Sequence, residues 1–182
     1  SKGIECIPVD AKYERLDLDE VMKRIQLAAP DIVGITAMTH EIKRANEVAG
    51  AVKKAFPSVT TVIGGAHATA LPTQTLAEFP AFDVGVFGEG ELTLFDLVKA
   101  IERRKGPEDV KGVVYRTAKG IHQNEPKEFI QNLDELPFPA WDLFNVRECY
   151  SRYPSHRSFL KAKRLGSIYT TRGCPFQCTF CY

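Results

Sequence analysis

Short β-branched runs alternate with amphipathic helical patterns over residues 3–124, and this alternation constrains the fold of the chain more than any other feature. The runs predict strands at Ile4–Val9, Asp31–Thr36, Val59–Gly64 and Asp83–Phe87. Helical patterns follow them, with apolar residues three or four positions apart, at residues 17–28, 42–56, 73–79 and 90–101. Such alternation predicts an α/β fold, a doubly wound parallel sheet with helices on both faces. Gly112–Arg116 and Gly120–Gln123 then predict a terminal hairpin.

Composition and charge exclude several classes of protein. The formal net charge is +1, so the chain has no global field that would attract nucleic acid or an acidic membrane. No run approaches 18 consecutive apolar residues, and the first residues lack a basic region followed by an apolar one, which predicts neither a membrane span nor a signal peptide. Three of the five cysteines lie within eight residues, a spacing that favours a metal site in a reducing compartment over a disulfide framework. The cytoplasm is the predicted location.

The three clustered cysteines, Cys174, Cys178 and Cys181, have the spacing C-x3-C-x2-C. Four thiolates saturate a [4Fe–4S] cluster, whereas three on one tight loop leave one iron open to a small molecule. The amino and carboxylate groups of S-adenosylmethionine suit such an iron. A zinc knuckle is the alternative, with His156 as a fourth ligand, although zinc sites usually have paired ligands and no second cysteine pair occurs here.

This motif resembles that of the radical S-adenosylmethionine superfamily. Phe180 directly precedes the last cysteine, as in the family pattern, and Ser167–Arg172 resembles the first strand of the family's barrel. The resemblance implies a [4Fe–4S] cluster on the three cysteines, bound S-adenosylmethionine, a 5′-deoxyadenosyl radical and an external electron donor. Because Tyr182 is the last residue, we expect this piece alone to lack the barrel and to be inactive.

The segment before the motif resembles the cobalamin-binding domain of the cobalamin-dependent branch of that superfamily. The resemblance rests on three loops at the carboxyl ends of successive predicted strands, residues 34–39, 64–69 and 88–91. Family members carry a Ser-x-Leu turn roughly 26–28 residues before a glycine pair. In this chain Thr36-Ala37-Met38 resembles that turn, with Thr and Met as replacements, and 25 residues separate it from Gly64-Gly65. The resemblance implies that cobalamin is bound by Thr36, Met38, Thr39, Gly64, Gly65, His67, Gly88, Glu89 and Gly90.

His40 and His67 both fall in the crevice that these loops predict. We expect His67 to be a hydrogen-bonding wall residue rather than a cobalt ligand. No Asp-x-His-x-x-Gly motif occurs in the chain, and the radical branch usually lacks that cobalt-ligating loop.

Three segments follow from these resemblances: a cobalamin-binding domain over residues 1–124, a linker over 125–165, and the start of a radical domain over 166–182. The domain is expected to be flavodoxin-like and to lack its first strand, because residues 3–10 resemble the second. Strand Ile4–Val9 is then expected to pair abnormally, unless a neighbouring chain fills the gap or the natural chain is longer. Within the linker, Gln131–Asn145 carries two prolines among apolar residues and predicts an extended strap that packs against a neighbour.

Residues 147–172 contain seven Lys or Arg and one acid. A solvated connector is the favoured interpretation of this stretch, and steering of an anionic substrate is the alternative. Its few aromatic residues argue against nucleic acid as a partner.

The preferred hypothesis is a fragment of a cobalamin-dependent radical enzyme. Family analogy makes its parent a methyltransferase or cyclase that acts on an unactivated carbon of a small-molecule substrate. Two alternatives stay open. The α/β domain is a non-catalytic binding module that positions the barrel, or the parent is a methylthiotransferase-like protein, although such proteins carry further cysteines where this chain has only Cys6.

Overall fold

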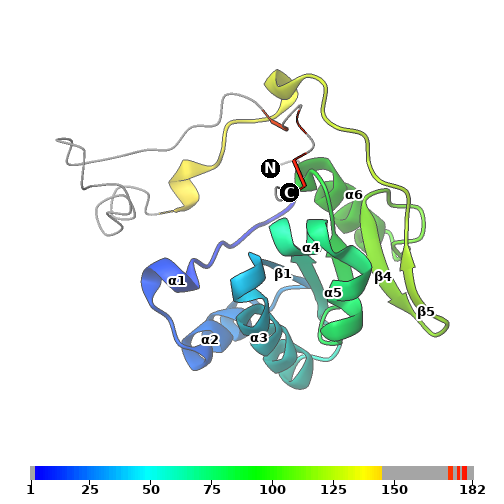
Figure 1. Ribbon diagram of the computed structural model, residues 1–182. Coiled ribbons are helices and arrows are strands. Elements are labelled where there is room, and N and C mark those ends of the chain that lie inside the picture. The colour runs from blue at the N-terminus through cyan, green and yellow to red at the C-terminus, as the bar shows by residue number, and fades with distance from the viewer. Residues whose placement is uncertain (1–2, 145–171, 174–175, 177, 180–182) are drawn as a thin grey trace. The chain divides into compact units, whose positions relative to one another are not determined.

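The computed structural model describes residues 3–144, 172–173, 176 and 178–179. The chain divides into two compact units (Figure 1). One is Leu18–Glu135, and the other combines Ser1–Asp17 with Leu136–Tyr182. No helix among the described residues is long and apolar enough to cross a membrane. The unit Leu18–Glu135 carries the sheet and all three candidate loops.

The sheet of this unit is mixed, with the strand order β1-β2-β3-β4-β5. The first three strands are parallel, and the last two are antiparallel to their neighbours: β1 Ile32–Thr36, β2 Thr60–Gly64, β3 Val84–Val86, β4 Val113–Thr117 and β5 Gly120–Gln123. The α/β class and the terminal hairpin are thus confirmed. The hairpin extends the parallel strands as part of the same sheet, which makes the whole sheet mixed.

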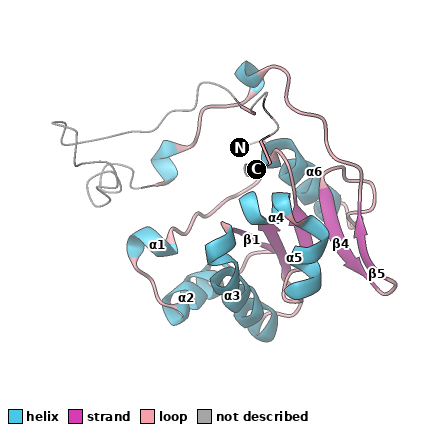
Figure 2. Ribbon diagram, viewed as in Figure 1, coloured by secondary structure: helices cyan, strands magenta, loops and turns pink. Residues whose placement is uncertain are grey.

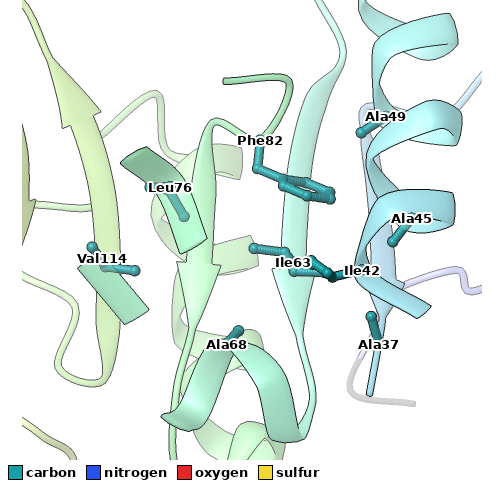
Figure 3. Close-up of a cluster of buried hydrophobic side chains, with 9 residues drawn as sticks. All are labelled: Ala37, Ile42, Ala45, Ala49, Ile63, Ala68, Leu76, Phe82 and Val114. Atoms are coloured by element: carbon teal, nitrogen blue, oxygen red, sulfur yellow. The ribbon is translucent and has the colours of Figure 1, made fainter. Parts of the chain in front are cut away.

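Helices pack on both faces of the sheet (Figure 2). On the two faces lie α3 Ile42–Ala55, α4 Ala66–Ala70, α5 Pro72–Glu78 and α6 Gly90–Glu102, whereas α2 Leu18–Ala28 contacts α3. One face carries α3, α4 and α5, whose apolar residues form a cluster around Ile63, Leu76 and Phe82, all three fully buried (Figure 3). The opposite face carries α6, which buries Leu97 against Val62, Val84 and Val113. Burial of apolar surface on both sides is what holds the parallel strands in place.

One predicted strand was wrong. Residues 4–9 adopt no regular structure, and Ile7 is 59% exposed. A strand exists only when its backbone groups pair with a neighbour, and Pro8 has no N–H to donate. The segment therefore does not pair with β1, and the expectation that a central strand is lacking stays a prediction.

The outer side of β1 has no strand beside it within the described chain, so β1 is an edge strand. Every residue of β1 is partly buried or exposed, whereas Val62, Ile63 and the whole of β3 are buried. Ile35 of β1 packs against the cluster on one face of the sheet and Ile32 against the cluster on the other, so both faces of this edge strand are partly covered.

A hydrogen-bonded lysine ties the amino ends of β2 and β3 to the end of α3. Lys53 Nζ donates to the Pro57 and Val59 carbonyls at 3.1 Å each and lies 2.9 Å from Asp83 Oδ2. The same carboxylate oxygen accepts the Thr61 N–H at 2.9 Å. These contacts fix the sheet at the edge opposite the candidate loops.

The second unit contains little regular structure in its described part. Helix α1, Ala11–Glu14, is capped by Asp10, whose Oδ1 accepts the Tyr13 N–H at 2.9 Å. The described part of the predicted strap, residues 131–144, holds two short 3₁₀ turns, η2 Leu133–Glu135 at the end of the first unit and η3 Trp141–Leu143 in the second. Phe138 is 95% exposed, so packing of the strap against a neighbour stays a prediction.

Tyr115, on β4, is expected to make the fold less stable at alkaline pH. Burial raises the pKa of its hydroxyl above the ordinary 10.0, and the charges of Glu108 and Asp109 raise that pKa further. The unfolded chain therefore releases this proton at a lower pH than the folded chain does. As pH rises through 10 toward the folded pKa, we expect the free energy of unfolding to fall.

Urea titrations of the wild type and of Tyr115→Phe, below and above pH 10, test this expectation. Phenylalanine keeps the ring that meets His122 edge-on at 5.4 Å and removes the titrating proton. The alkaline loss of stability should therefore be smaller in the variant. Equal losses in the two proteins would contradict the assignment to Tyr115.

Candidate functional site

Three loops meet at one edge of the sheet because they follow three parallel strands. The first loop follows β1 and leads into the 3₁₀ turn η1, Thr39–Glu41. The second joins β2 to α4, and the third joins β3 to α6. In open α/β sheets, ligands bind outside the carboxyl ends of the strands, which is where these loops lie. The predicted convergence of the three loops is thus confirmed.

Backbone hydrogen bonds join the first loop to the second. The Ala37 N–H donates to the Gly64 carbonyl at 3.2 Å, and the His67 N–H donates to the Ala37 carbonyl at 3.3 Å. The Met38 N–H donates to Glu41 Oε2 at 3.2 Å, and the Met38 side chain is 51% exposed. Backbone hydrogen bonds with the second loop therefore hold the turn Thr36-Ala37-Met38 in place, and the apolar side chain of Met38 is accessible to a ligand.

Gly65 sits where the two loops cross most closely. Its φ of 90° and ψ of −173° fall in a region that is essentially reserved for glycine. A Cβ at this position would lie 2.6 Å from Thr36 Oγ1 and 2.9 Å from the Ala37 carbonyl oxygen. Both the backbone conformation and the close approach therefore require glycine, so Gly65 shapes the site by bringing its two walls together.

Gly64 and Gly88 have the opposite surroundings. A Cβ built on either residue would meet no atom within 4 Å. Both glycines lie at the edge where the parallel strands end, so their bare backbone borders open space. This arrangement leaves room for a bulky organic ligand to approach the backbone closely.

His67 lies on α4, so the predicted loop over residues 64–69 was wrong from Ala66 onward. Four residues of that loop begin the helix, because Ala66–Ala70 contains good helix formers directly after the Gly65 turn. His67 is 6% exposed, and its Nδ1 shares a 3.2 Å hydrogen bond with Thr39 Oγ1. Its ring meets Phe79 edge-on at 6.3 Å. These contacts support a wall role for His67, whereas His40 is exposed.

The third loop contacts the second loop on one side and the chain after β5 on the other. The Gly88 N–H donates to Thr69 Oγ1 at 3.2 Å, and Glu89 Oε2 accepts the Ile130 N–H at 2.6 Å. Gly90 begins α6. Sequence reasoning missed Thr69 and Ile130 as partners of this loop, because contacts between residues 19 and 41 positions apart leave no local signal.

The cysteine motif is described only in part. Cys178 is a free, exposed thiol. Cys174, Cys181, the barrel-like residues 167–171 and most of the basic stretch 147–172 lie outside the described residues. Within the described residues, no group of three His, Cys, Asp or Glu is placed to hold a metal ion. Cluster binding by the three cysteines therefore stays a prediction.

Comparison with known protein families and curated proteins shows what this chain is similar to. Residues 1–98 match the family model described as the B12 binding domain. An uncharacterized methyltransferase of Pyrococcus horikoshii is 36% identical over 173 residues, 95% of this chain and 36% of that protein. The anaerobic magnesium-protoporphyrin IX monomethyl ester cyclase of Rubrivivax gelatinosus is 35% identical over 181 residues, 97% of this chain and 31% of that protein. The chain thus spans about a third of the length of these relatives.

Solved structures share the fold. The radical S-adenosylmethionine methyltransferase TsrM from Kitasatospora setae superposes with a TM-score of 0.62 at 21% identity, over 70% of this chain and 25% of that one. The cobalamin-dependent S-adenosylmethionine radical enzyme OxsB superposes with a TM-score of 0.55 at 22% identity, over 62% of this chain and 16% of that one. Because the family match covers more than half of its residues, the chain belongs to the B12-binding domain family.

Proposed function

We propose that the unit Leu18–Glu135 binds cobalamin at the carboxyl edge of β1, β2 and β3, as part of a radical S-adenosylmethionine methyltransferase or cyclase. The observation that carries the proposal is the contrast between the two adjacent glycines Gly64 and Gly65. One glycine borders open space at the strand end, and the other lets the neighbouring loop come within contact distance. Because the matching family model is the B12 binding domain, cobalamin is the ligand proposed for this geometry.

Each wall of the site has a distinct role in this proposal. Gly64 and Gly88 leave room for the ligand against bare backbone. Met38, half exposed, offers an apolar contact, and His67 closes the site with a side chain already oriented by Thr39. Thr39 Oγ1 engages Nδ1 of His67, so Nε2 is the nitrogen that would form a hydrogen bond to the ligand's polar edge in this proposal.

The reaction class rests on the relatives. A relative at 36% identity is named a methyltransferase, and one at 35% is named a cyclase. Bound cobalamin would supply a cobalt-carried methyl group in the first case. The three cysteines at 174, 178 and 181 would hold the [4Fe–4S] cluster that binds S-adenosylmethionine, with reduction by an external donor. The substrate would be a small molecule with an unactivated carbon, and the protein would act in the cytoplasm.

Retention of a corrinoid tests the proposal directly. The protein is incubated with hydroxocobalamin, desalted and examined by visible absorbance, with cobinamide, which lacks the nucleotide tail, as the comparison ligand. We expect stoichiometric retention of hydroxocobalamin and weaker retention of cobinamide, because the open space beside Gly64 would take the tail. Loss of hydroxocobalamin on desalting would favour the alternative, a binding module that only positions the barrel.

A further inference from the structure

Residues 124–131, here called the connector, run from β5 back along α6. The Asn124 side chain donates to three carbonyls of the loop before β4, those of Pro107 at 2.8 Å, Glu108 at 3.0 Å and Val110 at 2.8 Å. The Gly112 N–H donates to the Glu125 carbonyl at 2.8 Å. These contacts anchor the start of the connector to the hairpin side of the domain.

Two side chains at the other end hold the connector on α6. The Lys127 ammonium forms a salt bridge with Asp96 in the second turn of the helix. Glu89, at the N-cap position of α6, accepts the Ile130 N–H with its carboxylate at 2.6 Å. A carboxylate at this position commonly accepts an N–H of its own helix, but Glu89 makes no such capping bond. Its side chain is turned toward the connector instead.

Glu89 also belongs to the third loop of the candidate site. Gly88, its neighbour, donates to Thr69 of α4, and two residues earlier on α4 His67 contacts both Ala37 and Thr39 of the first loop. One continuous series of hydrogen bonds therefore runs from the first loop, through α4 and the third loop, to the connector. A ligand that orders any of the three loops would act on this series.

We propose that Glu89 is a positioning residue that fixes where the connector leaves the domain and makes that position respond to occupancy of the site. The inference rests on the proposed function for its ligand, but the anchoring of the connector does not. Residue 89 was predicted as a cofactor contact. In this proposal its carboxylate acts on the chain that leads to the cysteine motif, and it acts through the Ile130 amide rather than on the reacting atoms.

Hydrogen exchange at the Ile130 amide reports both parts of the proposal. In the absence of ligand, Glu89→Ala should speed exchange at Ile130 by roughly tenfold or more, because it removes a hydrogen bond to a charged group. Glu89→Gln keeps an acceptor oxygen and should show an intermediate rate. Saturating hydroxocobalamin should slow exchange at Ile130 in the wild type and leave the rate unchanged in Glu89→Ala.

Asp96→Asn is the matched control, because it weakens the salt bridge to Lys127 without touching the third loop. It should loosen the connector near residue 127 and still allow hydroxocobalamin to slow exchange at Ile130. A wild-type exchange rate in ligand-free Glu89→Ala would overturn the anchoring. The coupling would be overturned if hydroxocobalamin still slowed exchange at Ile130 in Glu89→Ala. It would also be overturned if corrinoid-loaded wild type showed no slowing at Ile130. Retention of corrinoid is measured separately. Failure to retain it would overturn both the proposed function and the coupling. The exchange rates without ligand would still test whether Glu89 anchors the connector.

Discussion

Gly64→Leu is expected to weaken hydroxocobalamin binding by a factor of roughly 5–150, because inserting a side chain where a ligand packs costs about 1–3 kcal/mol. The fold should tolerate the change. A Cβ at residue 64 meets no atom within 4 Å, so the leucine enters open space and not the core. The backbone of Gly64 is also that of a strand, where a side chain fits without strain. Visible absorbance titration of the two proteins measures the affinity, and urea unfolding measures the stability.

Gly50→Leu is the control for this prediction. Gly50 lies in α3, and a Cβ there also meets no atom within 4 Å, so the same side chain is added away from the candidate site. We expect its hydroxocobalamin affinity to equal that of the wild type. If Gly64→Leu binds as tightly as Gly50→Leu, the ligand does not use the space beside Gly64. If Gly64→Leu is instead unfolded, the open surroundings assigned to this glycine are incorrect.

The part of the site that could be predicted from sequence depends on local patterns. A strand followed by two glycines predicts a tight passage at residues 64–65, and the structure places the glycine-only conformation at Gly65. The 25-residue interval from Met38 to Gly64 spans one helix and one strand, so the first two loops had to reach the same edge of a parallel sheet. Local patterns also predicted the hairpin and the four helices α2, α3, α5 and α6 closely, because their buried faces repeat at regular spacing.

Other parts of the structure depend on partners that no local pattern specifies. Residues 4–9 have the composition of a strand and form none, because strand formation depends on a neighbouring edge as well as on β-branched residues. Helix α4 begins within two residues of a strand, where the glycine pair predicted a loop. Both differences arise from tertiary context overriding a local signal. The bond between Glu89 and Ile130 spans 41 residues, so no local pattern could predict it.

Gly65→Ala is expected to destabilise the fold far more than Gly64→Ala. A φ of 90° with a ψ of −173° costs a residue with a Cβ about 1–3 kcal/mol. The new methyl group would also lie 2.6 Å from Thr36 Oγ1 and 2.9 Å from the Ala37 carbonyl oxygen, which adds a packing cost of about 1–3 kcal/mol. Urea unfolding measures the sum. Gly64→Ala is the control, with open surroundings and no positive φ, and should stay within about 0.5 kcal/mol of the wild type.

A double-mutant cycle with Thr36→Ala separates the two costs. Removing Oγ1 relieves the 2.6 Å contact and leaves both the φ of residue 65 and the Ala37 carbonyl unchanged. The double variant should therefore recover part of the stability lost in Gly65→Ala, with the backbone cost remaining. Gly65→Asn should be no more stable than Gly65→Ala, because asparagine tolerates a positive φ mainly near the left-handed helical region, far from a ψ of −173°. If asparagine restores stability, the backbone at residue 65 is left-handed helical, and the close crossing of the first two loops must be redrawn.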